Sequence, residues 1–259
     1  MKSKMFLMNL IVVCILCMFS ATAFGEECGS IATSAGPSIL DKDLDDLLDQ
    51  YIPESSAQSR LLIFTECYAG DKLDDFADNP KTTVISATVA GQTAQYGGYH
   101  DDAADSLYAG PGRTADDVHA AGIAGKGPGE TPPPRQGPNA SLEPTDPAGT
   151  IKSRHVLVFN GMPNAQDNAD RDAIENNFAG DPNTTVTTCG GNGTGYDYPG
   201  TRAGLEAALN DISANMSPDE QFILFVGDHG NLEDYYDLSS ILGPIYPGIG
   251  PFALHDTAL

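Results

Sequence analysis

The chain has 259 residues and a formal net charge of -23, because 36 Asp and Glu residues outnumber 13 Lys and Arg residues. This negative charge argues against binding to nucleic acid or to anionic membrane surfaces, which repel an acidic protein. It favours solubility, cation binding or a basic partner. The length is sufficient to bury one substantial hydrophobic core.

Residues 1–25 have the features of a removable secretory signal peptide. Lys2 and Lys4 precede an apolar run over Met5–Phe19, and small residues are frequent in Ser20–Gly25. The apolar run is short for a transmembrane span. We therefore expect a secreted, periplasmic or cell-surface protein with no membrane contact beyond export. A lipoprotein is the less favoured alternative, because no lipobox precedes Cys28.

Three cysteines remain after removal of this leader: Cys28, Cys67 and Cys189. An odd number in an exported protein leaves at least one thiol unpaired or intermolecular. Cys28 and Cys189 could form a disulfide and leave Cys67 free. The alternative for Cys67 is a buried, inert thiol. No spacing of Cys and His indicates a structural zinc site.

The first half of the chain alternates between helical and extended patterns. Residues 38–51 place leucines on one helical face and aspartates on the other, which predicts an amphipathic helix. The apolar run that begins at Leu61 and ends at Cys67 predicts a buried strand. We then expect a short acidic helix through Phe76, a strand over Thr82–Thr88 and a loop over Gly91–Gly110.

A Gly- and Pro-rich segment follows over Gly110–Thr150 and includes Pro132–Pro134. Such a density of helix and strand breakers predicts a linker or surface excursion with little core structure.

The second half resumes the alternation. Its predicted elements are a strand over His155–Asn160, a helix over Asp167–Phe178, a strand over Thr184–Thr188, a helix carrying Leu205 to Met216, and a strand that begins at Gln221 and leads to His229. This order predicts an α/β fold in which helices flank a mainly parallel sheet. Cys67 and His229 then lie at the carboxyl ends of strands, where open α/β sheets bind ligands. A thiol and an imidazole at this edge would form a dyad for acyl transfer.

The residues around this dyad resemble those of legumain and other caspase-like cysteine peptidases. Gln221–Gly230, which ends in Asp-His-Gly, resembles the family's histidine strand, and Thr65–Gly70 resembles its nucleophile turn. Val84–Thr88 followed by Gln95–Asp101 is similar to the run after the family's cysteine. Val158–Gly161 and Asn168–Asp170 resemble its first strand and first helix.

The two halves occur in the reverse of the family's order, because Cys67 precedes His229 here. A circular permutation accounts for this order, with the former termini joined through the Gly- and Pro-rich segment. The resemblance therefore implies a single caspase-like sandwich over residues 26–259, with a Cys-bearing half at 26–109, a linker at 110–150 and a His-bearing half at 151–259.

The resemblance also implies roles for individual residues. Cys67 would attack a peptide carbonyl, His229 would protonate the leaving amine and activate water, and the N–H groups of Cys67 and Gly230 would stabilise the oxyanion. The substrate-binding candidates are Thr65, Gln95, Gln166, Asp167 and Asp170. Peptides or proteins are the expected substrates. No cofactor is expected, although calcium could regulate the enzyme.

Specificity is where the sequence departs from the family. Gln166 and Asp167 occupy the positions of an Arg-His pair in the S1 pocket of legumain. With Asp167 or Asp170 at the floor of that pocket, a Lys or Arg side chain at P1 would meet an opposite charge. The alternative is that these aspartates only cap the following helix. Self-cleavage is then expected in the linker region, which carries Arg113, Lys126, Arg135, Lys152 and Arg154.

Two other functions remain open from the residues alone. The first is an inactive caspase-like module that binds a partner or builds the cell surface. The second is a calcium-binding domain using the Asp-, Asn- and Gly-rich stretches 166–172 and 190–197, although neither has the ligand spacing of an EF-hand loop. Among the remaining histidines, His100 could line the cleft, but no chemical role is expected for it.

Overall fold

A computed structural model of the chain describes residues 26–67, 69–73, 76, 79–94, 98–107, 112–142, 153–163, 165–227 and 230–235. The predicted signal peptide lies outside these residues. Cys28–Leu232 form one compact unit, and the fold described below is the fold of this unit. In the described part of the chain, no helix has the length and apolar character that a membrane span requires.

The central sheet has five strands, all parallel, in the order β4-β3-β7-β5-β6. The strands are β3 (Ser59–Phe64), β4 (Thr82–Ser86), β5 (Arg154–Asn160), β6 (Thr184–Gly190) and β7 (Gln221–Val226). Every residue of β4, β5 and β7 is buried, which is why β5 and β7 have runs of consecutive apolar residues in place of a polar alternation. The predicted α/β class with a parallel sheet is confirmed.

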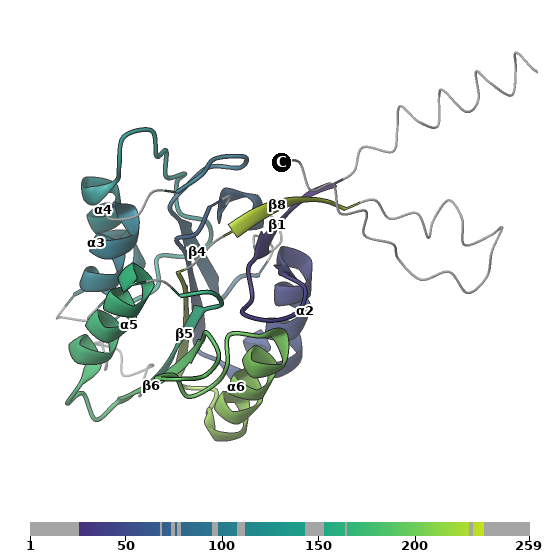
Figure 1. Cartoon of the computed structure of the whole chain (residues 1–259). Coiled ribbons are helices and arrows are strands. Elements are labelled where there is room, and N and C mark those ends of the chain that lie inside the picture. The colour runs from purple at the N-terminus through teal and green to yellow at the C-terminus, as the bar shows by residue number, and fades with distance from the viewer. Residues whose placement is uncertain are drawn as a thin grey trace, which may run out of the picture. The chain divides into compact units, whose positions relative to one another are not determined.

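Helices cover both faces of this sheet (Figure 1). One face carries α2 (Asp41–Tyr51) and α6 (Arg202–Asn215). The other carries α3 (Tyr99–Ser106), α4 (Ala115–Gly125) and α5 (Ala165–Phe178). Both predicted amphipathic helices on the first face are confirmed, because their apolar stripes contact the sheet.

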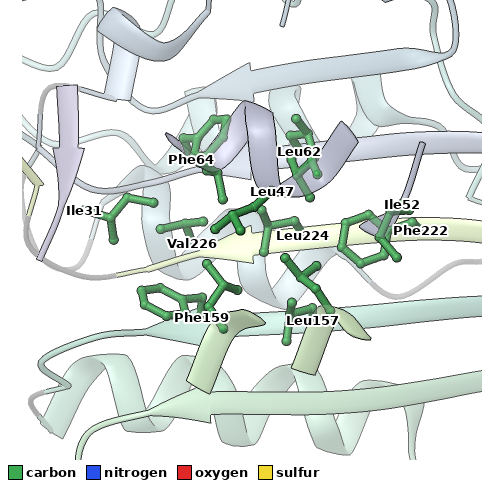
Figure 2. Packing of buried hydrophobic residues seen from close by; sticks show 14 of the residues in the cluster. Ile31, Leu47, Ile52, Leu62, Phe64, Leu157, Phe159, Phe222, Leu224 and Val226 are labelled. Carbon is green, nitrogen blue, oxygen red and sulfur yellow. The ribbon is translucent and has the colours of Figure 1, made fainter. Parts of the chain in front are cut away.

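Successive strand residues point into two separate cores. On β3, Leu62 and Phe64 face α2 and α6, whereas Leu61 and Ile63 face α3, α4 and α5. Figure 2 shows the first core, in which β3, β5 and β7 contribute side chains at matching levels. The strands are thereby held in register by packing on both faces as well as by hydrogen bonds.

Short elements outside the central sheet were not predicted. A second sheet has the order β2-β1-β8 and consists of β1 (Glu26–Ile31), β2 (Ile39–Leu40) and β8 (Gly230–Tyr235). A 3-10 helix, η1 (Glu54–Ser56), precedes β3. After Cys67, the chain forms the 3-10 helix η2 (Ala69–Lys72) in place of the predicted short acidic α-helix.

The Gly- and Pro-rich part of the chain contributes to the core, which corrects the prediction of a loop over 91–110 and a linker over 110–150. α3 lies within the first of these segments and α4 within the second. Val118 of α4 and Leu142 are fully buried against the sheet. Val84 of β4 and Gln136 exchange two backbone hydrogen bonds of 3.1 and 2.9 Å, so the segment also covers part of the sheet edge.

The prolines of this segment lie outside α4. Thr114 begins α4 with a capping box, in which its side chain and that of Asp117 satisfy each other's backbone N–H groups. The prolines of 131–138 follow the helix, and the carbonyl of Pro138 accepts a hydrogen bond of 2.6 Å from the Thr83 hydroxyl of β4. Residues 143–152 of the predicted linker lie outside the described residues.

Replacement of Val118 tests whether α4 belongs to the core. Val118→Ala should lower the free energy of unfolding by about 1–3 kcal/mol, because it leaves a cavity under the helix. Ile123→Ala is the matched control, since Ile123 lies on the same helix and is 39% exposed. It should cost less than about 0.5 kcal/mol in the same urea titration. Equal effects of the two changes would show that α4 does not pack on the sheet.

Candidate active site

The adjacent strands β3 and β7 end at the same level. Phe64 is the register partner of Val226, and beyond this pair Thr65 N–H donates to the Val226 carbonyl at 3.0 Å. The Thr65 hydroxyl donates to the same carbonyl at 2.9 Å. Thr65 is therefore buried and joins the two strand ends. Its hydroxyl makes a hydrogen bond inside the protein, whereas the sequence analysis predicts that Thr65 binds substrate.

Cys67 follows this junction and is partly buried. Its Sγ lies 3.7 Å from the Ala94 carbonyl oxygen, which is within the range of a weak S–H hydrogen bond. Burial raises the pKa of the Cys67 thiol; the contact with Ala94 lowers it, and the negative charge of Glu66 raises it further. These neighbours do not activate the thiol, so a thiolate at neutral pH needs a base or a cation close by.

Two of the predicted site residues, His229 and Gln95, lie outside the described residues. Asp228, the neighbour of His229, lies outside them too, whereas Gly227 and Gly230 on either side of this pair are described. Gly227 N–H donates to the Phe159 carbonyl at 3.1 Å, which continues the alignment of β7 with β5, and Gly230 begins β8.

A cluster of polar side chains lies beside the end of β7 and joins α3 to α5. His100 Nε2 is 3.0 Å from Asp170 Oδ2, and both side chains are buried. Gln166 Nε2 donates to Asp101 Oδ1 at 2.9 Å. The predicted substrate-binding residues Gln166 and Asp170 are thus brought together with His100 and Asp101, for which no chemical role is predicted from the sequence.

Asp167 occupies the first turn of α5 and is fully buried. Its backbone carbonyl accepts a hydrogen bond of 2.9 Å from Asn160 Nδ2, at the last residue of β5. This bond fixes the start of α5 against the end of the strand, at the carboxyl edge of the sheet.

The end of β7 contacts the cluster directly. The His100 ring stacks on Phe225, with 5.7 Å between the ring centroids. A Cβ atom at Gly227 would lie 2.5 Å from His100 Nε2, which is closer than atoms can approach. A glycine is therefore required at this position for the imidazole to fit beside the strand.

Burial and like charge control the ionisation of this cluster. Burial raises the pKa of Asp170 to about 7, and the nearby Asp101, Asp167 and Asp105 raise it as well. Burial lowers the pKa of His100 to about 4. The imidazole is neutral at pH 7, so its contact with Asp170 joins a neutral ring to a carboxyl group and is not an ion pair of full charges.

A groove of about 900 Å³ lies elsewhere, along β6 and α6 and the amino end of β5. It is polar and open, and it includes His155 and Glu220, whose side chains are 3.4 Å apart. It is remote from Cys67, because it runs along the edge strand β6. We place the candidate site at the carboxyl edge of β3, β7 and β5, where the thiol and the perturbed carboxyl groups lie.

The sequence leaves a disulfide between Cys28 and Cys189 open, and the structure describes the side chain of Cys189 alone. Cys189 is a free, buried thiol, and its Sγ lies 3.0 Å from the Pro199 carbonyl oxygen. Burial raises its pKa to about 12, which makes it chemically inert at neutral pH.

The signal for His100 and Asp101 was present in the sequence but weak. α3 buries Tyr99, Ala103, Ala104 and Ser106, and Leu107 at its C-cap is buried too. This helical pattern covers only eight residues and follows two glycines. Even where so short a helix is predicted, its first polar residues can be placed near α5 only when the order of the strands in the sheet is known.

Comparisons with family models, with curated proteins and with solved structures found no significant match.

The raised pKa of Asp170 makes stability depend on pH. Between about pH 4 and pH 7 the folded protein holds a proton on Asp170 that the unfolded chain has released, so this group's contribution to stability is lost as pH rises. Asp170→Asn removes the titration. The variant should gain about 1–2 kcal/mol of unfolding free energy relative to the wild type between pH 5 and pH 8.

Urea denaturation of both proteins at the two pH values measures this gain. Asp105→Asn is the matched control, because Asp105 is an exposed carboxylate of the same cluster's surroundings. Its stability relative to the wild type should change little with pH. An Asp170→Asn variant that loses stability relative to the wild type as pH rises would contradict the buried, protonated carboxyl group.

Proposed function

We propose that this protein is a caspase-like cysteine endopeptidase with Cys67 as nucleophile and His229 as its catalytic partner. The observation that supports it most is the parallel pairing of β3 with β7, in which Phe64 and Val226 are register partners. Cys67 and His229 each follow their member of this pair by three residues in the sequence. Chains leaving two neighbouring parallel strands at one level are suited to bring such residues together.

The pKa of Cys67 is consistent with a dyad. A half-buried thiol next to Glu66 is mostly protonated at neutral pH, so it attacks slowly unless a base takes its proton. His229 would accept that proton as Sγ attacks the peptide carbonyl carbon. It would return the proton to the leaving amine, and then take one from water as water releases the acyl group from Sγ. The N–H groups of Cys67 and Gly230 would stabilise the oxyanion in both steps.

The strand order supports a circular permutation. In the present chain order, the connection from β4 to β5 runs from one edge of the sheet past β3 and β7. If the strands are instead followed from β5 through β6 and β7 to β3 and β4, only the step from β6 to β7 skips a neighbour. Consecutive strands are usually adjacent in α/β folds, so the reordered path is the simpler one.

The acidic cluster supports a preference for a basic P1 residue. Asp101 and Asp170 lie with Gln166 at the edge beside β7, and Asp167 is close enough to raise the pKa of Asp170. A Lys or Arg side chain would displace the proton from Asp170 and form charge-assisted hydrogen bonds with the carboxylates. Gln166, in place of a family arginine, leaves this excess of negative charge available to the substrate.

Removal of either dyad member should abolish hydrolysis without unfolding the protein. Cys67→Ala and His229→Ala should each lower kcat/KM by about 1,000-fold or more on a peptide with Arg at P1. Cys189→Ala is the control for the other free thiol and should remain active. Labelling with peptidyl acyloxymethyl ketones carrying Arg, Lys, Asn or Asp at P1 would report both the nucleophile and the preference.

We expect the Arg and Lys probes to label the wild type and the Cys189→Ala variant, and to leave Cys67→Ala unlabelled. Undiminished hydrolysis by Cys67→Ala would remove the nucleophile. A profile led by Asn or Asp would leave the peptidase intact but refute the acidic pocket. No labelling by any probe in a folded protein would favour an inactive caspase-like module that binds a partner.

Self-cleavage is expected after Lys126, which is exposed at the end of α4. Arg154 is a poor site, in contrast to the expectation from the sequence, because it is 1% exposed and begins β5. Lys152 lies outside the described residues. Intact-mass analysis of the wild type should show two fragments, and Lys126→Gln should remove them. In the native protein the two fragments should stay associated through the shared sheet. The same cut in Cys67→Ala would point to another protease.

A further inference from the structure

The polar cluster beside β7 has the composition of a metal site. One ligand atom from each of His100, Asp101 and Asp170 can be chosen so that all three lie within 4.8 Å of one another. We propose that these three side chains bind a divalent transition-metal ion of the zinc class.

The buried pair of His100 and Asp170 is the main evidence for a bound metal ion. His100 and Asp170 are 5% and 4% exposed, and neither His100 Nε2 nor Asp170 Oδ2 has a hydrogen-bond partner among the described residues. The two atoms nevertheless face each other at 3.0 Å. Two ligand atoms of a tetrahedral zinc ion are about 3.3 Å apart, so this pair is already close to the spacing that a shared cation needs.

The negative charge around the cluster also favours the binding of a cation. Among the described residues, no lysine or arginine lies within ion-pair distance of Asp101 or Asp170, whereas Asp105 and Asp167 add to the negative potential at Asp170. Buried carboxylates are stabilised when they are paired or when they coordinate a metal. A divalent ion would satisfy both carboxylates and the neutral imidazole at once.

The choice of donor atoms points away from calcium, which the sequence had suggested as a regulator. Calcium prefers six to eight oxygen ligands, and this cluster offers an imidazole nitrogen with two carboxylates. Zinc and related ions accept this donor set, and three protein ligands leave a fourth position open. Gln166 would hold Asp101 from the second shell, through the hydrogen bond of 2.9 Å.

The position of the site gives it a regulatory consequence. Gly227 lies against His100, and it precedes His229 by two residues in the sequence. The carboxylates that would bind the metal are those that would bind a basic P1 side chain. Bound metal would therefore inhibit hydrolysis after Arg or Lys by competing for the pocket. This consequence rests on the proposed function, whereas the metal site itself does not.

The binding experiment uses the full untagged chain with Cys67→Ala, so that neither activity nor that thiol contributes. Titration with Zn²⁺ by calorimetry should give one equivalent per chain. Co²⁺ should bind at the same site with visible absorption bands of a low-symmetry complex containing nitrogen and oxygen ligands. In this background, His100→Gln and Asp170→Asn should each weaken Zn²⁺ binding by at least about 10-fold.

Two further variants keep the test independent of folding. Asp101→Asn changes a half-exposed side chain, should leave the circular dichroism spectrum unchanged, and should also weaken binding by about 10-fold. Asp105→Asn removes a nearby exposed charge without removing a ligand, and should change the affinity less than about 3-fold. Absence of binding, or binding unchanged in all three ligand variants, would overturn the site.

The two proposals fail separately. Stoichiometric Zn²⁺ binding that depends on His100 and Asp170 supports the site even if the wild type hydrolyses no peptide, and in that case only the peptidase is lost. Conversely, an active wild type in which Zn²⁺ neither binds nor competes with Arg substrates would refute the metal site alone.

Discussion

The parallel pairing of β7 with β3 on one side and β5 on the other is the constraint on which the rest of the site depends. Val226 is the register partner of both Phe64 and Phe159, so three strands end at one level. The two cores hold this register, because a slip of one residue would exchange Leu224 and Phe225 between opposite faces of the sheet. Figure 2 shows how closely Phe64, Phe159 and Val226 gather at that level. This packing determines where the site residues lie.

The second constraint is electrostatic. α5 directs buried aspartates at the same edge, and α3 adds His100 and Asp101. A cluster like this costs folding free energy, because burial disfavours each charge and the charges repel one another. Proteins retain such groups mostly where a cation is to be bound or a proton is to be held. Each of the two proposals supplies a cation that offsets this cost in folding free energy. In the peptidase it is the Lys or Arg side chain at P1, and in the metal site it is the metal ion.

The elements that the sequence predicted well are those with bulky apolar side chains. β3 and β7 follow from continuous runs of Leu, Ile, Phe and Val, and α6 follows from the spacing of Leu205, Leu209 and Ile212, all of which are buried. α3 and α4 were missed because they pack through small residues. Gly122 of α4 lies against the ring of Tyr99, where a Cβ atom would approach to 2.6 Å. Close helix packing through Gly and Ala leaves little hydrophobic periodicity in a sequence.

The site residues that could be predicted are those attached to these apolar elements. Cys67 could be predicted because it follows an apolar strand, and the first aspartates of α5 because they lie near the start of a predicted helix. The contacts of His100 with Asp170 and of Asp101 with Gln166 depend on α3 and α5 being neighbours. That neighbourhood is set by the strand order, which brings β5 beside β7 although β6 and α6 separate them in the chain. Gly227 connects the proposed metal site with the proposed dyad. It directly follows β7 and precedes His229 by two residues, and its lack of a side chain leaves the space that His100 occupies. A change in the ligands around His100 would be transmitted to the end of β7 through a direct contact, without any rearrangement of the sheet.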